Sequence, residues 1–168
     1  MIYLLRHCDK TAEAAGAPLS AMGLAQAQSL VPVLAKLGIQ RILCSPYVRA
    51  QQSVVPFAKT AGLNVESTDA LKEWRLASEM RVDWKAVLAR GLADPHAKAT
   101  GGESAAEVWA RAQSLLAADT PTLLVTHGGW LSVVLGHHGR PRTLEALFAL
   151  KSPDLFSLTP TGATQHEL

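Results

Sequence analysis

Short apolar runs alternate with longer segments of helical periodicity along this chain, which limits the folds open to it. The apolar runs are Tyr3–Leu5, Ile42–Cys44, Leu123–Val125 and Leu155–Leu158, and each has the length of a strand. Such alternation is typical of an α/β domain, in which helices connect neighbouring parallel strands. A length of 168 residues suits a single domain, 1–168, with a sizeable core.

The longer segments carry the start and stop signals of helices. Ser20 can cap the first helix and Gly38 can end it, while Pro32 and Pro56 fall inside expected helices and should kink them or remove a hydrogen bond. The helices are expected over 20–38, from Ser45 to about Ala61, around Met80–Leu88, after the capping box of Ser104 and Glu107, and from Trp130 toward His137. The inward face of the first helix is expected to carry Leu24, Ala27, Val31, Leu34 and Leu37.

Polar and reactive residue types follow directly after three of the apolar runs. Arg6 and His7 follow the first, Ser45 to Arg49 follow the second, and His127 follows the third. Ligands of open α/β sheets bind at the carboxyl ends of the strands. We therefore expect these polar groups to meet at one end of one sheet and to form a site there.

Charge and composition exclude several classes of protein. The net charge is +2 and the basic residues are scattered, which argues against a nucleic-acid-binding or membrane-surface protein. No apolar run approaches the roughly 18 residues of a transmembrane helix, and the N-terminus lacks the pattern of a signal peptide. A soluble cytoplasmic protein is the expectation, and its oligomeric state stays open.

The two cysteines, Cys8 and Cys44, predict neither a disulfide scaffold nor a zinc ribbon. Cys8 also fails as the nucleophile of a cysteine phosphatase, because Ala14 stands where the phosphate-gripping arginine of such a loop belongs. The residues between Cys8 and Ala14 contain two acids and no glycine, and this composition does not suit an anion-binding loop. The adjacent pair His137-His138 lacks spaced partners, so no metal site is expected there.

His7 is the better candidate for a nucleophile. A neutral imidazole can attack phosphorus near pH 7, since its reference pKa is about 6.5, and the resulting phosphohistidine would split hydrolysis into two easier steps. Phosphoryl transfer further needs positive donors around the phosphate oxygens, and Arg6, Arg49 and His127 could supply them. A carboxylic acid must protonate the leaving alkoxide.

Short motifs that contain these residues recur across almost the whole chain. They are Leu5-Arg6-His7, Pro18–Ala27 (PLSAMGLAQA), Ser45–Ser53 (SPYVRAQQS), Leu71-Lys72-Glu73, Gly101–Ser104 (GGES) and Val125–Gly129 (VTHGG). In this order they resemble the motifs of the histidine phosphatase superfamily, the phosphoglycerate-mutase-like enzymes.

The resemblance implies a cofactor-independent phosphatase that hydrolyses phosphate monoesters, with His7 as the phosphorylated nucleophile. Arg6, Arg49 and His127 would form the phosphate pocket, with His127 also taking part in catalysis, and Glu73 would protonate the leaving group and then deprotonate water. The implied fold is a three-layer α/β/α sandwich around a mainly parallel central sheet. The implied substrate is a small phosphorylated metabolite, and no metal is expected.

The chain departs from the family pattern in its first loop. Cys8 stands where the family has glycine, Asp9 where it has glutamate, and Glu13 where many members carry an asparagine that helps hold the phosphate. Glu103 and Asp9 are alternatives to Glu73 as the proton donor. Two other functions stay open, namely a phosphatase of phosphohistidine proteins and a catalytically idle phosphate-binding module.

The segments that would select the substrate are less well defined by the sequence. They are expected to be the loop from Asp9 to Pro18 and the stretch between Glu73 and Gly101. That stretch is too short for the substrate-enclosing segments of mutases, which favours hydrolysis. The tryptophans are expected in the core or in the wall of the pocket. Lys10 and Arg75 are expected at the surface, with a position facing the substrate as the alternative.

Overall fold

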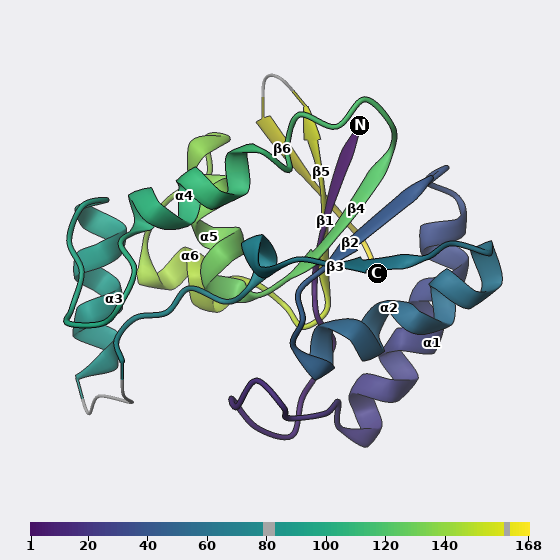
Figure 1. Ribbon diagram of the computed structural model, residues 1–168, viewed down its shortest axis with the longest axis horizontal. Coiled ribbons are helices and arrows are strands. Elements are labelled where there is room, and N and C mark those ends of the chain that lie inside the picture. The colour runs from purple at the N-terminus through teal and green to yellow at the C-terminus, as the bar shows by residue number, and fades with distance from the viewer. Residues whose placement is uncertain (79–82, 160–161) are drawn as a thin grey trace.

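The computed structural model describes residues 1–78, 83–159 and 162–168. Its centre is a six-stranded sheet with the strand order β3-β2-β4-β1-β5-β6 (Figure 1). The strands are β1 (Ile2–Arg6), β2 (Arg41–Cys44), β3 (Val65–Ser67), β4 (Thr122–Thr126), β5 (Asp154–Thr159) and β6 (Gly162–His166). β1 to β4 pair in parallel, whereas β5 and β6 pair antiparallel to their neighbours. The expected mainly parallel α/β fold is confirmed.

Helices cover both faces of this sheet (Figure 1). One side carries α1 (Ala21–Ala35) and α2 (Val48–Ala61), and the other carries α3 (Trp84–Ala93), α4 (Ala105–Gln113), α5 (Gly128–His137) and α6 (Leu144–Ala149), with the short 3-10 helix η1 (Asp69–Leu71). No helix among the described residues is long and apolar enough to cross a membrane.

The core consists of two apolar clusters, one on each side of the sheet. Leu5 and Leu123 belong to the cluster with α1 and α2, whereas their neighbours Leu4 and Leu124 belong to the cluster on the opposite face. Successive strand residues point to opposite faces. Continuous apolar runs are therefore needed for the central strands, because both of their faces are buried.

The helix signals in the sequence mark termini in the structure. Ser20 caps α1, and its Oγ accepts the N–H of Gly23 at 3.0 Å. Gly62 ends α2 in the left-handed conformation, with φ of 66°, which costs glycine no steric penalty. Ser104 and Glu107 form a complete capping box at α4. Of the helix expected around 80–88, α3 covers the part from residue 84, and residue 80 lies outside the described residues.

Two helix boundaries differ from expectation. α1 ends at Ala35, before the expected stop at Gly38, whereas Pro32 and Pro56 lie inside α1 and α2 as expected and both helices continue past them. α2 begins at Val48, later than the expected start at Ser45. The reason is that Ser45 belongs to the loop before the helix, where its hydroxyl accepts the N–H of Tyr47.

The inward face of α1 is rotated from the expected one. Ala27 and Leu34 are buried as expected, but Leu24 is 51% exposed. Gly23, and not Leu24, is the buried residue of this turn. A Cβ at position 23 would lie 2.0 Å from the carbonyl oxygen of Asp9. The backbone of the first loop thus packs against the helix at a position that only glycine permits.

Candidate active site

The carboxyl ends of three neighbouring strands bring the expected residues together. β4 lies between β1 and β2, so the residues that follow these strands are adjacent. The N–H of His7 donates to the carbonyl of Thr126, and the N–H of Ser45 donates to the carbonyl of Val125. As a result, the ring centroids of His7 and His127 lie 5.1 Å apart.

The His7 ring is buried and its two nitrogens have different partners. Nδ1 lies 2.7 Å from the carbonyl oxygen of Cys8, which can only accept, so Nδ1 carries the proton. Nε2 therefore keeps its lone pair, and it accepts from Nε of Arg49 at 3.2 Å. Burial, with the nearby charges of Arg49 and Arg6, lowers the pKa of His7 from 6.5 to about 3. The imidazole is thus neutral at physiological pH, as a nucleophile must be.

Arg49 is held in place beside His7 by the first loop. It lies in the first turn of α2 and is 1% exposed. Its Nη1 donates to the backbone carbonyls of Glu13 and Ala14, at 3.3 and 2.9 Å. A buried guanidinium is thus positioned by the backbone of the loop whose sequence departs from the family pattern.

His127 is fully buried and is oriented by Ser45, for which no specific role was predicted. Its Nε2 lies 2.8 Å from Oγ of Ser45. The same Oγ accepts the N–H of Tyr47, and its own proton can point to Nε2 of His127, in which case the ring proton lies on Nδ1. Its position directly after β2, in the same motif as Arg49, is the feature of the sequence that could have identified Ser45 as a site residue. Burial, followed by the charges of His7 and Arg49, lowers the pKa of His127 well below 6.5.

Two buried nitrogens next to His7 lack a protein partner. They are Nε of Arg6 and Nδ1 of His127, and neither has a hydrogen bond within the described parts of the chain. Nη1 of Arg6 is anchored by the carbonyl of Leu150 at 2.6 Å. A buried donor without a partner costs about 1–3 kcal/mol. An anion that reached these two nitrogens would supply the missing partner.

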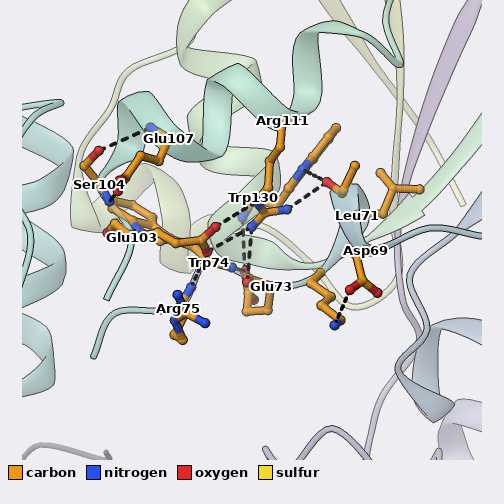
Figure 2. Close-up of polar contacts among 12 residues, drawn as sticks. Asp69, Leu71, Glu73, Trp74, Arg75, Glu103, Ser104, Glu107, Arg111 and Trp130 are labelled. Carbon is orange, nitrogen blue, oxygen red and sulfur yellow. Dashed lines mark hydrogen bonds and ion pairs between the residues drawn. The ribbon is translucent and has the colours of Figure 1, made fainter. Parts of the chain in front are cut away.

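Glu73 sits at the N-terminus of α5 (Figure 2). Its Oε1 accepts the N–H of Trp74 at 2.8 Å and that of Trp130, in the first turn of α5, at 3.1 Å. Gly129 permits this approach, since a Cβ there would lie 2.8 Å from Oε1. Because Oε1 is occupied by two donors, Oε2 is the oxygen that can carry a proton.

Glu103 and Asp9, the alternatives to Glu73 as proton donor, are hydrogen-bonded to other residues outside the cleft. Glu103 accepts hydrogen bonds from Nε of Arg111 at 3.0 Å and from the N–H of Arg75 at 3.1 Å (Figure 2). Asp9 accepts the hydroxyl of Ser20, the N-cap of α1. Neither acid lines the cleft that contains His7.

The unusual residues of the first loop, Cys8 and Glu13, lie in different surroundings. Cys8 is buried and its N–H donates to Oγ of Ser53 at 2.8 Å. No described residue other than glycine has a positive φ, so the Cβ of Cys8 is accommodated. Burial raises the pKa of the Cys8 thiol to about 11, which fits its rejection as a nucleophile. Glu13 lines the cleft that contains His7, where its carboxylate pairs with Lys10 at 3.0 Å and its side chain is 73% exposed.

A cleft of about 880 Å³ connects these groups to solvent. Arg6, His7 and Glu73 line it, whereas Arg49 and His127 lie buried behind it. Lys10 and Arg75, which were expected at the surface, also line this cleft. Among the described residues, no group of three or more His, Cys, Asp or Glu side chains could hold a metal ion.

Lowering the pH from 7 to 5 should reduce the free energy of unfolding, and His7 alone should account for about 2 kcal/mol. The folded pKa of about 3 lies below the unfolded value of 6.5. In this range only the unfolded state takes up a proton, so the stability that is present above pH 6.5 is lost as the pH falls toward 3. Urea unfolding at pH 5, 6 and 7 should show a smaller pH dependence for His7→Gln than for the wild type. Equal pH dependence in the two proteins would contradict the buried neutral imidazole.

Comparisons with known proteins identify the family of this chain. Residues 2–165 match the family described as the histidine phosphatase superfamily (branch 1). A search of curated proteins found no match. Mycobacterial glucosyl-3-phosphoglycerate phosphatase superposes with a TM-score of 0.72 at 25% identity, over 92% of this chain and 87% of that chain.

Two more distant structures share the fold. A protein of Thermus thermophilus gives a TM-score of 0.73 at 22% identity, over 99% of both chains. A phosphoserine phosphatase variant of Entamoeba histolytica, solved with phosphoserine, gives 0.72 at 20% identity, over 99% of this chain and 94% of that chain. Since the family match spans nearly the whole sequence, the chain belongs to the histidine phosphatase superfamily.

Proposed function

We propose that this protein is a phosphatase that hydrolyses small phosphate monoesters through a phosphohistidine on His7, without a cofactor. The observation that carries the proposal is the lone pair on Nε2 of His7 beside two buried nitrogens without partners, on Arg6 and His127. A phosphate group bound there would satisfy both donors. The Nε–H of Arg49, which donates to Nε2 of His7 in this structure, would turn to a phosphate oxygen and release that lone pair.

In the first step, Nε2 of His7 forms a bond to phosphorus while the bond from phosphorus to the ester oxygen breaks. The leaving alkoxide takes the proton from Oε2 of Glu73. The phosphorylated ring is positively charged, and its Nδ1–H stays hydrogen-bonded to the carbonyl of Cys8, which stabilises that charge. The cationic groups around the phosphate neutralise its oxygens.

In the second step, Glu73 acts as a base. Its carboxylate takes a proton from a water molecule, whose oxygen attacks phosphorus and breaks the bond to Nε2 of His7. Inorganic phosphate leaves, and Glu73 is protonated again for the next cycle. The opening of the cleft to solvent gives water access to the phosphohistidine, which favours hydrolysis over transfer to a second alcohol.

The position of Glu73 favours an ester over a phosphohistidine protein as the substrate. An alkoxide needs a proton donor more than the nitrogen of a phosphoramidate does. Glucosyl-3-phosphoglycerate phosphatase, at 25% identity, acts on a small phosphate ester by its name, which supports the same class here. The Cβ of Cys8 is accommodated in the first loop, and the acid Glu13 is paired with Lys10, which supports an active enzyme over an idle binding module.

The direct test is to trap the phosphoenzyme with a chromogenic aryl phosphate. A rapid quench in alkaline detergent preserves phosphohistidine, and peptide mass spectrometry should place the phosphate on His7. The label should form equally in EDTA, because no step uses a metal. Label on another residue, or a requirement for divalent cations, would remove the mechanism. Substrate binding without label or turnover would instead identify a binding module.

A further inference from the structure

Two large aromatic side chains are exposed inside the cleft. Trp84, at the start of α3, is 36% exposed, and Phe148, in α6, is 51% exposed. Their ring centroids lie 6.2 Å apart with an interplanar angle of 82°. Both line the same cleft as His7. The other strongly exposed apolar residues include Met22 and Leu24, which lie on α1, outside this cleft.

Much of the apolar lining of the cleft comes from two helices. Arg6, His7 and Glu73 reach the cleft from the end of β1 and from the segment after the 3-10 helix η1, and further polar groups come from Lys10, Glu13, Arg75, Ser78 and Ser152. Its apolar residues come largely from α3 and α6, which lie on one side of the sheet in Figure 1. Val87, Leu88 and Leu147 continue the apolar lining around the two aromatic rings. The cleft of about 880 Å³ is much larger than a phosphate group requires, so most of it is available to the alcohol part of a substrate.

We propose that the alcohol part of the substrate carries an apolar ring that binds against Trp84 and Phe148. The inference rests on the proposed phosphatase function, because the phosphate on His7 is what brings the alcohol into the cleft. Two rings at nearly right angles form a corner, in which a third ring can stack on one and meet the other edge to face. Burying such a ring removes apolar surface of all three groups from water.

A matched pair of substrates tests this inference. Ethyl phosphate and 2-phenylethyl phosphate have leaving alcohols of similar acidity, so a difference in kcat/KM reports on binding of the ring. The wild type should prefer the phenyl ester by about 30- to 100-fold. Trp84→Ala and Phe148→Ala should each reduce this preference by about fivefold or more, whereas Trp84→Phe should keep most of it. Met22→Ala, which removes an exposed apolar side chain on α1, should retain the wild-type preference.

The failures of the two proposals are distinguishable. Hydrolysis of both esters without a preference for the ring would overturn the inference and leave the phosphatase intact. A preference that survives in both alanine variants would place the ring elsewhere and would also overturn it. Absence of both turnover and phosphohistidine would remove the proposed function. Competitive inhibition by 2-phenylethylphosphonate, compared with ethylphosphonate, measures the same preference without chemistry and should show the same ranking.

Discussion

Replacing His7 by alanine should lower kcat by at least ~10⁴-fold, because the variant has no group that can form the covalent intermediate. The remaining cationic groups would still bind phosphate, so KM should change far less than kcat. Single-turnover kinetics with p-nitrophenyl phosphate would measure both values. The phosphate label should disappear in the same variant.

The fold should persist in this variant. His7 lies at the end of β1, after the strand pairing is complete, and its backbone N–H to Thr126 is unaffected by truncation of the side chain. Circular dichroism and thermal unfolding would verify this. His96→Ala is the matched control, since His96 is exposed and lies outside the cleft. Activity of His7→Ala comparable to that of the control would overturn the assignment of the nucleophile.

Replacing Glu73 by glutamine should reduce kcat/KM for alkyl phosphates by about 10²- to 10³-fold but change aryl phosphates little. The glutamine oxygen can still accept the two N–H groups of Trp74 and Trp130, so the position of the side chain is retained. What is lost is the acidic proton on Oε2. An alkoxide needs that proton to leave, whereas p-nitrophenolate leaves without it.

The measurement is a series of esters with alcohols of graded acidity. The dependence of the rate on leaving-group acidity should be steeper in Glu73→Gln than in the wild type. Glu103→Gln serves as the comparison, because Glu103 is the other acid of this region and is bound to Arg111. Any loss in that variant should be the same for alkyl and aryl esters. Equal loss on both classes in Glu73→Gln would remove Glu73 from the proton-donor role.

The central strands and most helices could be predicted because their sequences carry strong physical signals. β1, β2 and β4 are buried on both faces and therefore read as continuous apolar runs. Ser20 and Ser104 cap helices where the pattern indicated. β3 and β6 were not predicted. They lie at the two edges of the sheet, where residues such as Glu66 and Gln165 face solvent and give no apolar pattern.

The chemistry of the site was accessible from sequence only where residues follow strands. Arg6, His7, Arg49 and His127 meet because parallel strands end together. The hydrogen-bond partners of the candidate acids could not be predicted from the sequence, because they come from residues far away along the chain. Glu73 lies 57 residues from Trp130, whose N–H it accepts. Residues of α6, including Phe148, reach the cleft for the same reason.

The spacing of neighbouring strands, about 4.8 Å, determines how far apart His7 and His127 lie. His7 and His127 leave adjacent strands and are joined by the backbone hydrogen bond from His7 to Thr126. In the proposed mechanism, substitutions in α3 or α6 would change the space for the alcohol without moving these two histidines. A descendant of this chain could acquire a new substrate without rebuilding its reaction.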